Sequence, residues 1–271
     1  MSLPEIIREV KSSVVMILCR TAYRTRPLTG EFITNGTLPD AIPIATARQS
    51  LIWSKGTGFI FDEERGFIGT AYHVVENCAP GTQILILKDN GLHNATIVAF
   101  DINADVALLQ TEPLGTTSLV LGNYTDGLEG METIFTGFPL EFDFPITHKG
   151  IISSKTQIKY SANRNPVDIF TVNAFVNRGN SGGPLIAFEG ENGIKVIGII
   201  NARIDINLQA QLLHLPQNYA PGMTIGGVDP IGLSVETYNR ALALIGDVGQ
   251  VGIGFSSSID YLNNLIPEER E

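Results

Sequence analysis

The chain has 271 residues, which is enough for one large domain or two small ones with a sizeable buried core. Hydrophobic residues make up 44% of the sequence and charged residues 17%, as in ordinary soluble globular proteins. The net charge of −10 argues against binding to nucleic acid or to anionic membranes, because both kinds of partner need basic patches on the protein.

The first predicted element is a short amphipathic helix over residues 3–11, with Ile6 and Val10 on one side. Its charged residues interrupt any apolar segment of a signal peptide. The apolar run that follows, residues 14–19, is far shorter than the roughly 18 residues that a membrane-spanning helix needs. We therefore expect no signal peptide and no membrane span. The protein would then be cytoplasmic, or it would be exported and the sequence would be that of a processed form without its signal peptide.

Six short strands are predicted before residue 112, and turn residues separate them. They cover residues 13–18, 56–61, 67–70, 84–87, 95–100 and 105–111. Six strands of this length suit one small closed β-barrel. Residues 20–54 interrupt the strand pattern with several glycines and prolines, which predicts a long irregular insertion.

A second set of six strands follows the turn-rich segment 112–128, which we interpret as a connection. These strands are predicted at residues 133–138, 147–154, 168–172, 184–188, 194–202 and 252–256. The fold class is thus all-β: an N-terminal antiparallel barrel over residues 1–111 and a C-terminal one over 129–271. The C-terminal barrel would carry an insertion at 203–249 with one helix, residues 235–245, and a short helix at 259–265.

A glycine-rich stretch, residues 177–185, places Ser181 just ahead of an apolar run. The glycines allow a tight turn in which the backbone N–H groups of Gly179 and Ser181 point at one spot, as in an oxyanion hole. A serine nucleophile also needs a histidine base and an acid that orients it. His73 stands where a strand meets a helical turn, and Asp105 heads an apolar strand. The order His, Asp, Ser is that of chymotrypsin and differs from that of subtilisin and of the α/β-hydrolases.

Six segments together resemble the trypsin-like serine proteases of the chymotrypsin fold, and within them the HtrA/DegP-type protease domain without a PDZ domain. The segments are residues 56–60, 70–75, 105–109, 179–185, 196–199 and 252–255, in the order of that family. The resemblance implies a serine endopeptidase in which His73 is the general base, Asp105 orients it and Ser181 is the nucleophile. The oxyanion hole would consist of the N–H groups of Gly179 and Ser181.

The resemblance also indicates where a specificity pocket would lie. Its base would be Phe175, six residues before Ser181. Its wall would come from Asn201, Ala202 and Arg203. Because Phe175 carries no negative charge, we expect the enzyme to prefer an apolar P1 residue over lysine or arginine.

Two other functions fit parts of the pattern. A latent or non-catalytic polypeptide-binding module, chaperone-like in its role, would result if the two long insertions held the oxyanion loop in the wrong shape. An esterase or lipase would need a GxSxG turn that leads into a helix and the order Ser, Asp, His, whereas the residues after Ser181 predict a strand.

We expect no cofactor and no metal, because four histidines and two cysteines are scattered without ligand spacing. Cys19 and Cys78 are expected to be reduced apolar residues. Some relatives in the wider fold carry a cystine at the position of Cys78, so a disulfide between Cys19 and Cys78 is the alternative. The expected partner is a polypeptide substrate, with no nucleic acid and no membrane. The protein would be a monomer or, as HtrA-like proteins often are, a homotrimer.

Overall fold

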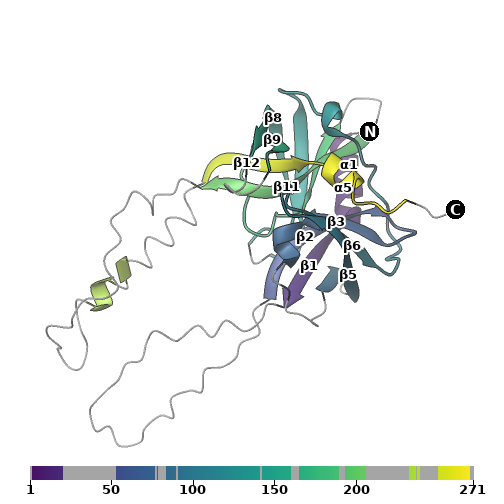
Figure 1. Ribbon diagram of the computed structural model, residues 1–271, viewed down its shortest axis with the longest axis horizontal. Helices are drawn as coiled ribbons and strands as arrows, with labels where there is room; N and C mark the ends of the chain where they lie inside the picture. The colour runs from purple at the N-terminus through teal and green to yellow at the C-terminus, as the bar shows by residue number, and fades with distance from the viewer. Residues whose placement is uncertain are drawn as a thin grey trace, which may run out of the picture. The chain divides into compact units, whose positions relative to one another are not determined.

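The computed structural model consists of two closed β-barrels of six strands each (Figure 1). It describes residues 2–20, 53–76, 78, 84–89, 91–140, 142–159, 165–188, 193–205, 232–235, 237–238 and 250–268. The predicted all-β fold class with two six-stranded barrels is confirmed. The domain boundaries at residues 111 and 129 remain predictions. The predicted insertion at 20–54 and the predicted helix at 235–245 lie almost entirely outside the described residues.

The first barrel contains the strands β1 to β6 in the order β1-β2-β3-β6-β5-β4. These strands are β1 Val14–Arg20, β2 Trp53–Asp62, β3 Phe67–Ala71, β4 Ile84–Lys88, β5 Gly91–Asp101 and β6 Val106–Thr111. The strand β5 begins four residues earlier than predicted. Lys88 pairs with Gly91, and Asp89 adopts a positive φ of 47°, so the hairpin closes through a two-residue turn. Residues 91–94, which lie before the predicted start of the strand, therefore belong to β5.

The second barrel contains β7 to β12 in the order β10-β11-β12-β9-β8-β7. These strands are β7 Glu132–Gly137, β8 Ile146–Ile158, β9 Val167–Asn173, β10 Pro184–Phe188, β11 Ile194–Asp205 and β12 Gln250–Ser258. The segment between the barrels contains a single 3-10 turn, η1 Tyr124–Asp126. Both barrels belong to one compact unit of the chain.

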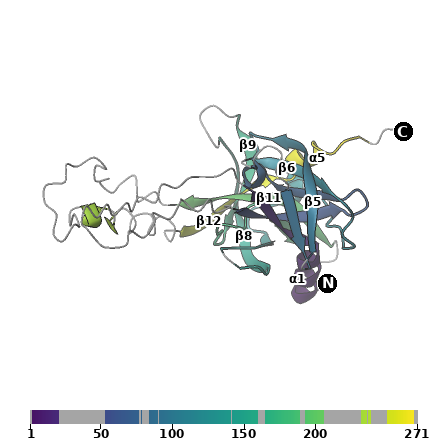
Figure 2. The same ribbon diagram turned by 90° about the horizontal axis from the view of Figure 1, so that it is seen from below.

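Among the described residues, the short helices that accompany the barrels are α1 Leu3–Ser13, α2 Tyr72–Val75 and α5 Asp260–Asn263. The helix α1 agrees with the prediction and buries Ile6 and Val10. Figure 2 shows that α1 and α5 lie on opposite sides of the two barrels. The helix α5 is shorter than predicted, and its Leu262 packs into the core. None of the helices within the described ranges is long and apolar enough to cross a membrane.

One apolar core holds the two barrels together. Buried side chains of the first barrel, among them Phe59 and Leu108, form one cluster with Ile134 and Ile186 of the second barrel. A smaller cluster around Phe170 fills the second barrel. Because apolar burial contributes about 25 cal/mol per Å², this shared core holds the facing sides of the barrels in one arrangement. Residues from both barrels can therefore form a single site.

A disulfide joins Cys19 and Cys78, which corrects the expectation that both cysteines are reduced. Their Cα atoms lie 5.4 Å apart, within the usual range for a disulfide. Cys19 lies near the end of β1, and Cys78 follows α2. The two positions become neighbours only once the barrel has closed, and their separation of 59 residues in the sequence does not reveal the contact.

Replacing both cysteines by serine should lower the free energy of unfolding. Since the two cysteines are 59 positions apart in the sequence, the chain entropy that the unfolded state regains predicts a cost of about 4 kcal/mol. Urea unfolding of the double variant and of the parent protein under non-reducing conditions measures the difference. Two titratable thiols in the unfolded, unreduced parent would contradict the disulfide.

Candidate active site

His73 and Asp105 meet in the first barrel. His73 lies in α2, directly after β3, and Asp105 lies directly before β6. Because Ala71 of β3 pairs with Val106 of β6, the two side chains are brought together although 32 residues separate them. The Nδ1 atom of His73 lies 2.7 Å from Oδ2 of Asp105, and the backbone N–H of His73 donates to Oδ1 at 2.8 Å. With a carboxylate as acceptor, Nδ1 carries the proton and Nε2 is left as a base.

Asp105 is held in a strained backbone conformation. Its φ of +57° is left-handed, which costs a residue other than glycine about 1–2 kcal/mol. Its backbone carbonyl accepts a hydrogen bond from the N–H of Tyr72 at 3.1 Å, and its side chain is only 10% exposed. The contacts with the segment 72–73 therefore hold the carboxylate in place.

The pKa of His73 is raised above its ordinary value of 6.5. Burial by itself would lower this pKa. The hydrogen bond to Asp105 and the negative charges of Asp105 and Glu76 favour the protonated imidazole and together outweigh the effect of burial. Asp105 thus stabilises the imidazolium ion that forms when His73 accepts a proton.

A hydrolytic reaction that uses His73 as a base should therefore show kcat/KM rising with pH through an apparent pKa above 6.5, because only the neutral imidazole accepts a proton. Rates measured from about pH 5 to about pH 9 locate this limb. In a Glu76→Gln variant the limb should move to lower pH, since one of the charges that raise the pKa is gone. If the apparent pKa of the parent were 6.5 or lower, the effect of burial on His73 would outweigh that of the hydrogen bond and the negative charges.

Ser181 lies in the turn just before β10, between two glycines with positive φ: Gly179 at +94° and Gly182 at +87°. A Cβ atom on Gly182 would lie 2.0 Å from the carbonyl oxygen of Thr57 and 3.0 Å from the backbone nitrogen of Ala71. The backbone N–H of Thr57 donates to the carbonyl of Ser181 at 2.8 Å. The turn of Ser181 therefore packs directly against the end of β3, which leads into His73.

No hydrogen bond between the Ser181 hydroxyl and His73 exists within the described part of the chain. In unliganded enzymes such hydrogen bonds are often long and tighten only with substrate. The structure thus brings His73 and Asp105 into direct contact and brings the Ser181 turn beside them.

The peptide groups on both sides of Gly179 are anchored. Thr57 Oγ1 donates to the carbonyl of Gly179 at 2.6 Å and accepts from the N–H of Phe138 at 3.0 Å. The N–H of Leu140 donates to the carbonyl of Arg178 at 2.7 Å. These contacts hold the peptide planes and with them the direction of the Gly179 N–H. Thr57 was not predicted as a functional residue, because residues 56–61 were interpreted only as a strand.

The N–H groups of Gly179 and Ser181 donate to no other backbone group within the residues that the structure describes. Both donors are therefore available for the oxygen of a ligand. An oxyanion hole also needs the two N–H groups to face the same oxygen, and that arrangement remains a prediction.

The structure describes the side chains of two of the four residues predicted for the specificity pocket, Phe175 and Asn201. Phe175 is 60% exposed, and its ring lies beside Gly252 at the start of β12. The side chain of Asn201 is buried and donates to the carbonyl of Ala104, so it is engaged within the protein. The side chains of residues 202 and 203 lie outside the described part of the structure. The pocket wall remains a prediction.

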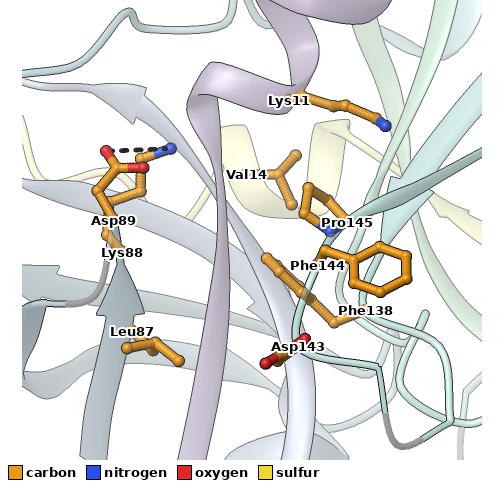
Figure 3. Close-up of a pocket in the computed structure, with 9 residues that line it drawn as sticks. All are labelled: Lys11, Val14, Leu87, Lys88, Asp89, Phe138, Asp143, Phe144 and Pro145. Carbon is orange, nitrogen blue, oxygen red and sulfur yellow. Dashed lines mark ion pairs between the residues drawn. The ribbon is translucent and has the colours of Figure 1, made fainter.

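A cavity of about 270 Å³ lies next to the C-terminal end of α1 (Figure 3). It is lined by Lys11, Val14, Leu87, Lys88, Asp89, Phe138, Asp143, Phe144 and Pro145. None of His73, Asp105 and Ser181 lines it. Phe138 belongs to the lining and also donates through its backbone to Thr57, so the cavity adjoins the anchor of Gly179 without being part of the site.

Within the described ranges, no three histidine, cysteine, aspartate or glutamate side chains lie close enough together to hold a metal ion. The site itself offers three kinds of chemical group. These are an imidazole with a buried carboxylate behind it, a hydroxyl in the adjoining turn and two backbone donors.

The sequence of the chain is similar to those of known proteases. The chain is 34% identical over 158 residues to a probable periplasmic serine endoprotease, DegP-like, of Pseudomonas fulva, covering 58% of this chain and 31% of the relative. It is 31% identical over 216 residues to the magnetosome formation protease MamE of Paramagnetospirillum magneticum, covering 78% of this chain and 26% of that relative. The chain thus spans less than a third of the length of these two proteins.

Two solved structures share the fold. The active form of the Rv3671c protease of M. tuberculosis has a TM-score of 0.60 and 16% identity, covering 96% of this chain and 82% of that one. The serine endoprotease of Yersinia pestis has a TM-score of 0.56 and 18% identity, covering 97% of this chain and 65% of that one. The family model described as trypsin-like peptidase domain matches residues 56–199, which is more than half of the chain. The resemblance inferred from the sequence is thereby confirmed, and this chain belongs to the trypsin-like peptidase family.

Proposed function

We propose that the protein is a serine endopeptidase of the HtrA/DegP type that uses Ser181, His73 and Asp105 as its catalytic triad. The observation that carries the proposal is the double contact of Asp105 with His73, through Nδ1 and through the backbone N–H, beside the turn of Ser181. Membership of the trypsin-like peptidase family and the names of the relatives support the same reaction.

In the proposed reaction, the hydroxyl of Ser181 attacks the scissile carbonyl while Nε2 of His73 takes its proton. The N–H groups of Gly179 and Ser181 stabilise the oxyanion of the tetrahedral intermediate. The protonated His73 then gives the proton to the leaving amine, and an acyl-enzyme remains. Water, activated by His73 in turn, hydrolyses the acyl-enzyme and regenerates Ser181.

The substrate class is a polypeptide, as the names of the relatives suggest. For the P1 residue we propose an apolar side chain. The exposed ring of Phe175 supports this choice, since it offers a hydrophobic contact and no negative charge. A peptide library with varied P1 residues tests it, and a preference for lysine or arginine would contradict it.

We further infer that the protein works outside the cytoplasm. Relatives named periplasmic proteases and the disulfide between Cys19 and Cys78 support this location, because disulfides persist mainly in oxidising compartments. The alternative of a cytoplasmic protein has no comparable support. Cell fractionation with an antibody against the chain tests the location.

A fluorophosphonate probe tests the nucleophile directly. We expect the parent protein to be labelled on Ser181 and a Ser181→Ala variant to remain unlabelled, because the probe reacts only with an activated serine. Peptide mapping of the labelled protein identifies the modified residue. Ser181→Ala is also the control for casein cleavage.

The probe separates the proposed function from the second candidate, a latent polypeptide-binding module. Labelling together with casein cleavage supports the endopeptidase. Labelling without cleavage would favour a latent or narrowly specific protease. The absence of labelling in a folded parent would contradict an activated Ser181.

A further inference from the structure

Residues of the second barrel hold the backbone just ahead of Asp105. The carbonyl oxygen of Ala104 accepts hydrogen bonds from Ser257 Oγ at 2.6 Å and from Asn201 Nδ2 at 3.2 Å. The amide of Asn201 also donates to Ser257 Oγ at 2.6 Å, which leaves the hydroxyl proton of Ser257 for Ala104. Asn201 belongs to β11 and Ser257 to β12, neighbouring strands of the second barrel (Figure 1).

These contacts are shielded from solvent. Ala104 and Ser257 are fully buried, and Asn201 is 5% exposed. The opposite side of Ala104 is anchored as well, because its N–H donates to Oδ1 of Asp101 at 3.0 Å. A buried carbonyl with two donors has a strongly preferred orientation, since turning it away would leave donors and acceptor unpaired.

The carbonyl of Ala104 belongs to the peptide group whose nitrogen is that of Asp105. Its orientation therefore limits the φ angle of Asp105, which is left-handed at +57°. That unusual conformation aims both carboxylate oxygens at His73, one at Nδ1 and one at the backbone N–H. Asn201 and Ser257 of the second barrel thus act on Asp105 of the first barrel through the peptide group that joins Ala104 to Asp105.

We propose that Asn201 and Ser257 are positioning residues for the catalytic acid: by holding the carbonyl of Ala104 from the second barrel, they keep Asp105 aligned with His73. This inference rests on the proposed function, since alignment matters to the reaction only if His73 is its base. It also gives Asn201 a role that differs from the pocket wall predicted from the sequence.

Two variants test the proposal. Ser257→Ala removes the stronger donor to Ala104. Asn201→Leu keeps roughly the size of the side chain but removes the second donor to the carbonyl and adds no charge near His73. The matched control is Ser256→Ala, which removes an equally buried hydroxyl from the adjacent position of β12 that does not contact Ala104. All three variants should lose some thermal stability, so stability alone does not decide the question.

The deciding measurement is the pKa of the His73 imidazole, followed by NMR in a Ser181→Ala background. Asp105 and Glu76 are the charged groups that raise this pKa, and the variants leave Glu76 in place. We expect the pKa of His73 to fall in Ser257→Ala and in Asn201→Leu, by on the order of half a unit, and to stay unchanged in Ser256→Ala. An unchanged pKa in both test variants, or an equal fall in the control, would overturn the proposal.

Kinetics on variants that retain Ser181 provide the second measurement. We expect Ser257→Ala to lower kcat about tenfold with KM unchanged, and Ser256→Ala to leave both near the parent values. A kcat that falls equally in both variants would also contradict the proposal. If the parent protein hydrolyses nothing, the proposed function fails, whereas the NMR titration still decides whether Asn201 and Ser257 align Asp105.

Discussion

A His73→Ala variant should lose nearly all hydrolytic activity, with kcat lower by roughly 10⁴- to 10⁶-fold and KM little changed. The reason is that Ser181 would have no base to take its proton, and Asp105 would have nothing to orient. Substrate binding depends on other surfaces and should persist. Steady-state kinetics on a peptide that the parent cleaves measures both constants.

A variant that combines His73→Ala with Ser181→Ala tests whether the two residues act as one unit. Groups that act as one unit are strongly non-additive, so the double variant His73→Ala/Ser181→Ala should be no less active than either single variant. The reference for all three is the uncatalysed rate in buffer. A His73→Ala variant that keeps a tenth or more of the parent activity would show that another group serves as the base.

A Gly182→Ala variant should lose both stability and activity. The added Cβ would lie 2.0 Å from the carbonyl oxygen of Thr57 and 2.3 Å from Oγ1 of Thr70, and φ at this residue is +87°. Backbone strain and overpacking together predict a loss of about 2–5 kcal/mol in the free energy of unfolding. The turn must move away from β2 and β3, which carries Ser181 away from His73.

Gly115→Ala is the matched control for this prediction. Gly115 also has a positive φ, +71°, but no atom lies within 4 Å of the position of its Cβ. It should therefore show only the cost of backbone strain, about 1–2 kcal/mol, and keep its activity. Urea unfolding and the rate of fluorophosphonate labelling measure the two effects. Equal losses in both variants would mean that close contact at Gly182 is unimportant.

Much of the fold was predictable because the barrels are built from local patterns. Short runs of β-branched and apolar residues, separated by turn residues, indicated twelve strands, and the positions of the strands agree to within a few residues. Most differences occur at strand ends. At Gly91, for example, a tight turn extends the hairpin beyond what the pattern suggested.

The candidate triad was accessible from the sequence because its chemistry is concentrated in short motifs. The glycines around Ser181 indicated a turn, and the run that begins at Asp105 indicated an acid at the head of a strand. The two cysteines were expected to be reduced, with the disulfide between Cys19 and Cys78 only as the alternative, and no sequence pattern pointed to the anchoring role of Thr57. Both depend on contacts between segments that are far apart in the chain.

The all-β class, the number of strands and their order along the chain followed from periodicity and turn chemistry, which are local properties of the residues. The residue types that would perform the reaction followed from short motifs. Tertiary structure alone decided which groups meet. Closure of the first barrel brings β3 beside β6 and so His73 to Asp105, and packing of the second barrel places Asn201 and Ser257 on Ala104. These contacts are set by the shared apolar core and by hydrogen bonds between strands. Neither produces a local pattern in the sequence, because both join residues that are far apart in the chain.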